Sequence, residues 1–256
     1  MKNKKLSILL VLLIIIGYAF SSCAKNTTTA IDTAAEITVS SLKKTQDMGQ
    51  EYIDSFVFLG ESTTYHMKSR GVLKDGTNTQ QVWGTKSGTL NLDTTIQSVR
   101  IVYPQTGEEI TIADALKKST PEKILLTFGL NGAVQKYQKG KEYFKDCYKA
   151  LLDTIKTASP HTQIFIQSAF PIAKNIDMKS YTVDSATLNQ YIDTINCWSA
   201  ELALEYQIPF LNTAECLKGE DGYLRHGYQA GDGYHLTVEA YMEILNYIRT
   251  HGYTEG

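Results

Sequence analysis

The chain has 256 residues and a formal charge of −2, and no basic patch indicates a nucleic-acid partner. Residues 50–256 are enough for one sizeable core and too few for two domains. The four cysteines, Cys23, Cys147, Cys197 and Cys216, have no Cys/His spacing typical of a zinc site. These features exclude a nucleic-acid-binding protein and a zinc-ribbon protein, and they favour a single globular domain.

The first 23 residues are typical of an export signal. A basic start, Met1 to Lys5, precedes the apolar stretch Leu6 to Phe20, which is shorter than the roughly 20 residues of a membrane-spanning helix. Ser21-Ser22-Cys23 resembles a bacterial lipobox, which predicts removal of residues 1–22 and lipidation of Cys23. Phe20 stands where lipoboxes usually carry Leu, so an uncleaved amino-terminal anchor is the alternative. Both interpretations place the rest of the chain outside the cytoplasm, tethered to a membrane.

The segment that follows Cys23 is rich in Thr, Ala and Ser and contains few large apolar residues. Such a composition is typical of a flexible spacer, so we expect a tether over residues 23–49 and a folded domain over residues 50–256. Loss of residues 1–22 removes three lysines and no acidic residue, which changes the formal charge from −2 to −5. An acidic mature protein again disfavours binding to nucleic acid.

Five apolar runs of strand length follow in the domain, separated by segments of helical periodicity. The predicted strands are Phe56–Leu59, Gln80–Trp83, Ile124–Phe128, Gln163–Gln167 and Pro209–Leu211, with an additional β segment at Ser98–Tyr103. The predicted helices are Ile112–Lys118, Tyr143–Ile155, Leu188–Leu202 and Val238–Thr250. Cys147 and Cys197 fall in helical patterns and are expected to be buried thiols. The alternation predicts an α/β fold, a three-layer α/β/α sandwich around a parallel sheet.

Residues able to do chemistry follow the ends of these elements. Gly60-Glu61-Ser62 follows the first strand, Gly129-Leu130-Asn131-Gly132 follows the third, and Asp232-Gly233-Tyr234-His235 precedes the last helix. Parallel strands bring their carboxyl ends to one edge of a sheet, where ligands of α/β folds bind. A serine, a histidine base and a carboxylate are the parts needed for nucleophilic acyl transfer, and an Asn amide can donate to an oxyanion.

Each of these residues also has a structural interpretation. Ser62 is a good N-cap for a helix that starts at Thr63, and Asp232 either accepts a hydrogen bond from His235 or only shapes the turn. His226 is the rival to His235 as the base, whereas His66 is expected to be a surface or rim residue. Three tyrosines near His235 are expected either to pack within the loop or to stack on sugar rings: Tyr223, Tyr228 and Tyr234.

The order and spacing of these motifs resemble the SGNH/GDSL hydrolase family, over about residues 55 to 250. The family's Gly-Asp-Ser appears as Gly60-Glu61-Ser62, its Gly-x-Asn-Asp as Gly129-Leu130-Asn131-Gly132, and its Asp-x-x-His is intact at Asp232 to His235. A further block supplies a glycine to the oxyanion hole, for which Ser87-Gly88-Thr89 fits better than Gly84. Glu61 and Gly132 depart from the family pattern, and neither position carries the nucleophile, the base or the amide donor.

This resemblance implies a flavodoxin-like fold with five parallel strands and a serine esterase mechanism. Ser62 would be the nucleophile, His235 the base and Asp232 its orienter, with an oxyanion hole formed by Ser62, Gly88 and Asn131. No metal or organic cofactor is implied. We expect an ester hydrolase that removes acetyl or other short acyl groups from carbohydrate or cell-wall substrates at the cell surface.

Two other functions stay open at this point. Tethering to a membrane through Cys23 suggests a lysophospholipase or other lipid esterase as the first alternative. The departures at Glu61 and Gly132 suggest a catalytically weak, glycan-binding lipoprotein as the second. The expected partners are the ester substrate and the membrane, with no nucleic acid, and the protein is expected to be a monomer.

Overall fold

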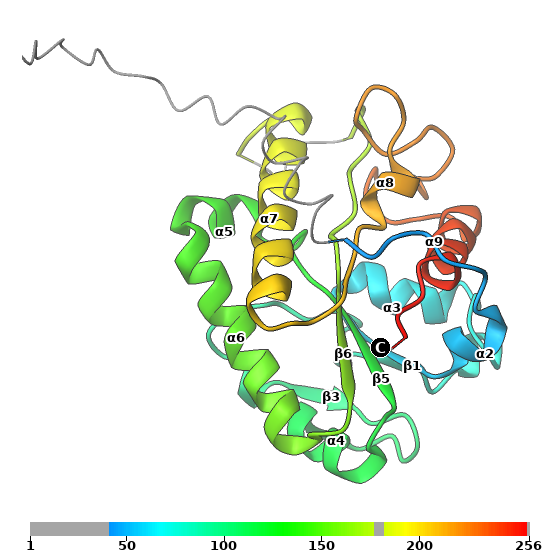
Figure 1. The fold of residues 1–256 in the computed structure, drawn as a ribbon. Helices are drawn as coiled ribbons and strands as arrows, with labels where there is room; N and C mark the ends of the chain where they lie inside the picture. Colours follow the sequence, from blue (N-terminus) through cyan, green and yellow to red (C-terminus); the bar gives the residue numbers. More distant parts are fainter. Residues whose placement is uncertain (1–40, 177–181, 255–256) are drawn as a thin grey trace, which may run out of the picture.

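The computed structural model describes residues 41–176 and 182–254, and its centre is one parallel β-sheet (Figure 1). The sheet has the strand order β2-β1-β5-β6-β7, and every pair of neighbours in it is parallel. The five strands are β1 (Phe56–Gly60), β2 (Val82–Trp83), β5 (Lys123–Thr127), β6 (Gln163–Gln167) and β7 (Phe210–Leu211). The predicted α/β class and the flavodoxin-like sheet are confirmed. The predicted signal peptide and Cys23 lie outside the described residues.

Helices cover both faces of this sheet and make the three layers (Figure 1). One layer contains α4 (Ile112–Ser119), α5 (Ala133–Lys139), α6 (Lys141–Ala158) and α7 (Ser185–Glu205). The other contains α2 (Gly49–Asp54), α3 (Ser62–Ser69), α8 (Ala214–Leu217) and α9 (Val238–Thr250). Because each layer buries its own apolar cluster against the sheet, the strands are apolar on both faces, as their sequences indicated.

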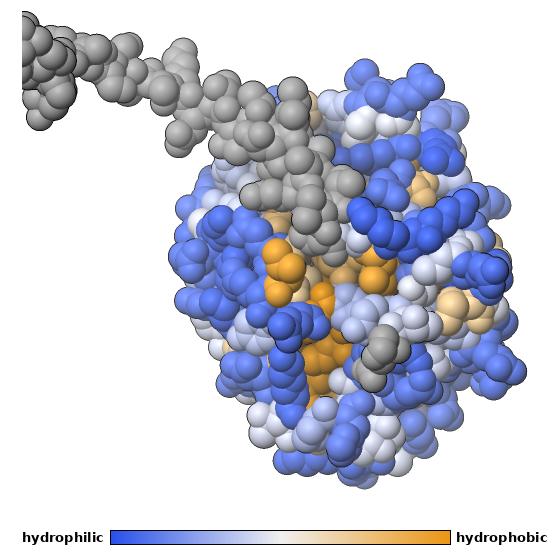
Figure 2. Space-filling model, viewed as in Figure 1, coloured by the Kyte–Doolittle hydropathy of each residue, from blue (hydrophilic) through white to orange (hydrophobic). Residues whose placement is uncertain are grey.

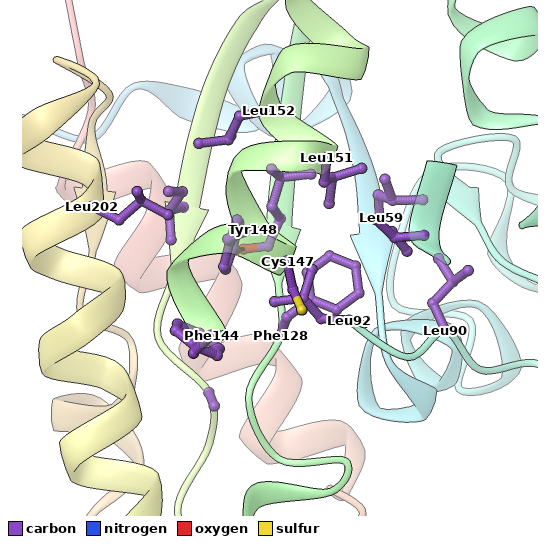
Figure 3. Close-up of a cluster of buried hydrophobic side chains, with 14 of the residues drawn as sticks. Leu59, Leu90, Leu92, Phe128, Phe144, Cys147, Tyr148, Leu151, Leu152 and Leu202 are labelled. Carbon is purple, nitrogen blue, oxygen red and sulfur yellow. Dashed lines mark hydrogen bonds between the residues drawn. The ribbon is translucent and has the colours of Figure 1, made fainter. Parts of the chain in front are cut away.

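Helix α6 shows how the sequence pattern becomes core. Its large apolar residues recur every three or four positions, and those from Phe144 to Ile155 are buried. Figure 3 shows Cys147, Tyr148 and Leu151 of α6 within this cluster, with Leu151 on the side toward Leu59. Burial of one large apolar side chain contributes about 1.5–3 kcal/mol, so this helix anchors one layer firmly.

Differences from the predicted elements occur where segments are short. The additional β segment is present as β3 (Arg100–Val102), which pairs antiparallel with a strand that was not predicted, β4 (Glu109–Thr111). Helices α2, α5 and α8 were also not predicted. Each has four to seven residues, too few for a periodic pattern to stand out from its surroundings.

The folded part of the chain begins before the predicted boundary at Gln50. The N–H of Leu42 donates to the carbonyl of Phe210 in β7 at 2.9 Å, and the N–H of Met48 donates to the carbonyl of Arg249 in α9 at 2.9 Å. Residues 41–48 were predicted to belong to the tether. Their partners lie far away in the sequence, so local composition carried no sign of these contacts.

The sheet has a switch point between β1 and β5, from which the chain proceeds outward in both directions. Ligands of open α/β sheets bind outside the carboxyl ends of the strands at such a point. Figure 2 shows polar surface over both helix layers and a narrow apolar strip between them, over the β6 end of the sheet. Within the described ranges, no helix is long and apolar enough to cross a membrane.

Candidate active site

Strand β1 ends at Gly60, where the backbone packs too closely for any side chain. A Cβ at Gly60 would lie 2.4 Å from Thr64 Oγ1 and 2.5 Å from the carbonyl oxygen of Thr127 in β5. The tight junction turns the chain directly into α3, whose N-cap is Glu61 and whose first residue is Ser62. Ser62 is therefore not the N-cap, and its N–H is one of the four that a helix leaves without an internal acceptor.

The structure brings Ser62, His235 and Asp232 into one hydrogen-bonded row. Ser62 Oγ lies 2.9 Å from His235 Nε2, and His235 Nδ1 lies 2.6 Å from Asp232 Oδ2. In the tautomer with hydrogen on Nδ1, the ring donates to Asp232 and accepts from the Ser62 hydroxyl. This arrangement prepares a hydroxyl to lose its proton as it attacks a carbonyl carbon.

The Asp232 carboxylate has both of the roles between which the sequence could not decide: it contacts the His235 ring and it shapes the turn. Its Oδ2 meets the His235 ring, and its Oδ1 accepts the N–H groups of Tyr234 at 3.1 Å and His235 at 2.9 Å, which shapes the turn. Partial burial alone would raise the pKa of Asp232. The hydrogen bonds from His235 and Tyr234 outweigh burial and lower the pKa below its usual value, so the carboxylate is charged at neutral pH.

Asn131 reaches the same cleft from the loop between β5 and α5. Its Nδ2 donates to Thr89 Oγ1 at 2.9 Å and contacts the carbonyl oxygen of Leu90 at 3.4 Å. The second contact is at the long limit of hydrogen bonding, so one amide hydrogen is only weakly engaged. Sequence reasoning gave Thr89 no role of its own, although it lay in the block that contains Gly88.

Gly88 lies in the cleft wall, but its N–H already has an acceptor. That N–H donates to the carbonyl of Thr85 at 2.9 Å inside a turn, so in this structure it does not point freely into an oxyanion site. The glycine is still needed, because its φ is +76° and a Cβ would lie 2.8 Å from the Tyr65 ring. Gly84 is buried at the end of β2, and its carbonyl accepts the N–H of Val102.

The cleft in front of Ser62 has a volume of about 440 Å³. Its wall is mostly aromatic and polar. It contains Ser62, Tyr65, His66, Ser87, Gly88, Thr89, Leu130, Asn131, Tyr234 and His235.

His66 belongs to this wall and is not merely a rim residue. Its ring stacks on His235 with centroids 4.0 Å apart and planes 25° apart, one helical turn after Ser62. Partial burial lowers the pKa of His66, and electrostatic interaction with His235 and Arg70 lowers it further, against the opposing charge of Asp232. The sequence contained a signal for this position, because Ser62 and His66 are four residues apart and such residues share one face of a helix.

Several other residues near the motifs are not part of the cleft wall. Thr63 and Thr64, which follow Ser62 in α3, are buried, with 2% and 3% of their surface exposed. His226, the rival base, is exposed and is not part of the cleft wall. Tyr228 packs under Arg225, and Tyr223 packs under Lys174, as loop-packing residues do.

Cys147 and Cys197 are buried, as expected, and Cys216 is partly buried. Burial raises the pKa of the Cys216 thiol to about 12, so it is not a reactive thiolate at neutral pH. In the described part of the chain, no group of three or more His, Cys, Asp or Glu side chains is placed to hold a metal ion.

Comparison with known proteins places the fold and the family. The sequence model of the GDSL-like lipase/acylhydrolase family matches residues 58–242. A GDSL-like lipase from Bacteroides thetaiotaomicron superposes with a TM-score of 0.53 at 18% identity, over 86% of this chain and 94% of that chain. The acetylxylan esterase Axe2 from Geobacillus stearothermophilus gives a TM-score of 0.44 at 16% identity, over 78% and 94%. A search of the curated proteins found no match.

The family match spans well over half of the chain and contains Ser62, Asn131 and His235. The solved lipase shares the same kind of α/β fold. The chain therefore belongs to the GDSL-like lipase/acylhydrolase family and is a GDSL-type serine ester hydrolase.

Proposed function

We propose that this chain is a cell-surface esterase that removes acetyl or other short acyl groups from carbohydrate or cell-wall substrates through an acyl-enzyme. The observation that carries the proposal is the hydrogen-bonded row from Ser62 through His235 to Asp232, which opens on a cleft with little aliphatic lining.

The reaction follows from the positions of these groups. Ser62 Oγ attacks the ester carbonyl carbon while His235 Nε2 takes its proton, and Asp232 stabilises the imidazolium that forms. The tetrahedral intermediate then collapses, and His235 returns the proton to the departing alcohol oxygen. Water, deprotonated by His235, attacks the acyl-enzyme in the same way. Acetate leaves as the second product, and Ser62 is regenerated.

The negative oxygen of each tetrahedral intermediate needs donors on the other side of the carbonyl. The N–H of Ser62 at the start of α3 and the side-chain amide of Asn131 are the proposed donors, and an oxyanion would replace the weak contact of that amide with Leu90. One such donor is worth about 2.7–4 kcal/mol in the transition state. Gly88 joins them only if its turn opens, because its N–H is bonded to Thr85.

The lining of the cleft supports a short acyl group. Leu130 is the single aliphatic side chain in the described wall, whereas a buried methylene group gains about 0.8 kcal/mol only when it leaves water for an apolar surface. Tyr65 and Tyr234 offer ring faces of the kind on which sugar rings pack. A long acyl chain would find no continuous apolar channel here.

A panel of esters tests the substrate class. The full chain, purified in detergent, is assayed with p-nitrophenyl esters from acetyl to octanoyl and with acetylated xylo-oligosaccharides, with Ser62→Ala as the matched control. We expect kcat/KM to be greatest for acetyl, to fall with acyl length, and free acetate to be released from the acetylated sugar. A preference for octanoyl would support the lipid-esterase alternative. Equal, negligible rates for both proteins would support the glycan-binding alternative.

The proposed location depends on the amino terminus. The basic start, the short apolar stretch and Ser21-Ser22-Cys23 support a lipid anchor at Cys23, and a diacylated cysteine anchors a protein stably. Mass analysis of membrane-extracted protein is expected to find an acylated Cys23 as the first residue. A chain that starts at Met1 would show an uncleaved anchor instead.

A further inference from the structure

Glu61, the residue before Ser62, has a carboxylate that crosses to the loop after β5. The side chain is buried, with 2% of its surface exposed. Its Oε1 accepts the N–H of Gly129 at 3.0 Å, and its Oε2 accepts the N–H groups of Leu130 at 3.0 Å and Asn131 at 2.9 Å. Three successive backbone N–H groups of one loop therefore donate hydrogen bonds to a single side chain.

Lys136, from the helix that follows this loop, acts electrostatically on the Glu61 carboxylate. Burial raises the pKa of Glu61 above its usual value, and the positive charge of Lys136 and the three N–H groups offset only part of that shift. Lys136 is itself buried, with 6% exposed, and its ammonium donates to the carbonyl oxygen of Asn131. A buried carboxylate is tolerated when it is hydrogen-bonded, and here Glu61 and Lys136 both hydrogen-bond to the backbone of Asn131.

The loop needs such support because its backbone is unusually free. Gly129 has φ +137° and Gly132 has φ +65°, two conformations that a chain of L-residues does not hold by itself. Glu61 joins the loop to the first turn of α3, in which Ser62 follows directly. The carboxylate thereby ties the residue with the nucleophile hydroxyl to the residue with the side-chain amide.

We propose that Glu61 is a positioning residue that fixes the Asn131 amide relative to Ser62 and so sets the geometry of the oxyanion hole. The inference rests on the proposed role of Asn131 as an oxyanion donor. It also gives a reason for Glu at this position: Asp is shorter by one methylene group, about 1.5 Å, and does not reach all three N–H groups from the same backbone.

The first test compares Glu61→Gln with the unaltered full chain on a short activated ester. Glutamine has the same shape but presents an NH₂ group to at least one N–H donor. We expect kcat to fall by about 10²–10³, as for loss of one oxyanion donor, with KM nearly unchanged. In the double variant with Asn131→Ala, kcat should equal that of Asn131→Ala alone, because both changes remove the same interaction. Losses that multiply in the double variant would overturn the proposal.

A matched control separates positioning from general loss of stability. Gln81 Nε2 donates to the carbonyl oxygens of Ile53 and Phe56, at the opposite end of β1 from Ser62. Gln81→Leu should lower the thermal midpoint and leave kcat unchanged. A similar fall in kcat for Gln81→Leu would show that any weakening of β1 reduces activity, and the proposal would fail.

A second readout does not depend on activity or on the glutamine variant folding. Glu61→Asp keeps the charge and shortens the reach, so the amides of Gly129, Leu130 and Asn131 should exchange with deuterium at least tenfold faster than in the unaltered chain. Unchanged exchange would overturn the proposal. If exchange accelerates but Asn131→Ala retains full kcat, the tie exists and the proposed oxyanion role of Asn131 is wrong. The two failures are thus distinguishable.

Discussion

The loop that carries Asn131 and the turn that carries His235 reach the same cleft but are held in different ways. The Asn131 loop is held from outside, by a buried carboxylate about 70 residues earlier in the chain. The turn from Gln229 to His235 is held largely from within. Gln229 Oε1 accepts the N–H groups of Gly231 and Gly233, and Asp232 accepts two more from its own neighbours.

Because of this difference, the Asn131 amide is positioned more rigidly than the His235 base. The buried carboxylate of Glu61, at the start of α3, fixes the amide donor relative to Ser62, whereas the base lies on a turn whose tip is exposed to solvent. One tertiary contact also restrains the turn, because the N–H of Ala173 donates to the carbonyl of Gly233 at 2.7 Å. We expect substitutions in the turn to alter proton transfer with little loss of stability. Substitution of Glu61, which supports the Asn131 loop, should lower both the catalytic rate and the stability.

The largest expected effect is on the turn. His235→Ala should lower kcat by about 10⁶, because nothing else takes the Ser62 proton, and Ser62→Ala should cost about as much. The double variant should be little worse than either single one, since the two groups act as a unit. Ester hydrolysis measures the rate of each variant, and circular dichroism checks that each variant is folded. Near-normal rates in a folded Ser62→Ala protein would remove the serine from the mechanism.

The next effect separates the two roles of Asp232. Asp232→Asn keeps an oxygen for the N–H groups of the turn but removes the charge that orients His235, so kcat should fall by about 10⁴. The thermal midpoint should change little, because the turn retains its internal contacts. A large drop in the midpoint would mean that the carboxylate mainly shapes the turn.

Asn131→Ala should lower kcat by about 10²–10³ with little change in KM, because the amide acts on the transition state. The backbone of the loop should stay in place, since Glu61 binds N–H groups and not the side chain. Steady-state kinetics separate the two parameters. A rise in KM alone would identify Asn131 as a binder of the ground state.

Gln229 supports the His235 turn as Glu61 supports the Asn131 loop, so Gln229→Ala can be compared with Glu61→Gln. It removes two hydrogen bonds at the surface, so the free energy of unfolding should fall by about 1 kcal/mol. We expect kcat to fall severalfold at most, far less than for Glu61→Gln. Denaturant titration and ester hydrolysis check this. Equal losses at the two positions would contradict the distinction between loop and turn.

The smallest effect concerns pH. The pKa of His66 is lowered in the folded protein by burial and by its charged neighbours, so below about pH 6.5 the unfolded chain binds more protons than the folded one. Stability should therefore fall as pH decreases from about 6.5. In His66→Gln the thermal midpoint should depend less on pH over this window. Identical pH dependence in both proteins would assign the loss to other groups.

The elements determined by the sequence alone are those whose signals are local. The predicted strand Gln163–Gln167 and the predicted helix Val238–Thr250 have the observed bounds, because a buried strand and an amphipathic helix impose short-range periodicities. Thr237 caps that helix with a side-chain hydrogen bond to Ala240, which fixes its start. The Asp-x-x-His turn was equally visible, since Asp232 and His235 are three residues apart and contact one another directly.

Only the tertiary structure decided which groups meet across long separations. The contacts of Glu61 with Gly129, Leu130 and Asn131, of His66 with His235, and of Leu42 with Phe210 join residues 68 to 169 positions apart. Periodicity and composition describe a residue's immediate neighbours and contain no information on such pairs. Sheet order and helix packing bring them together, because strands β1 and β5 are adjacent only once the parallel sheet has formed.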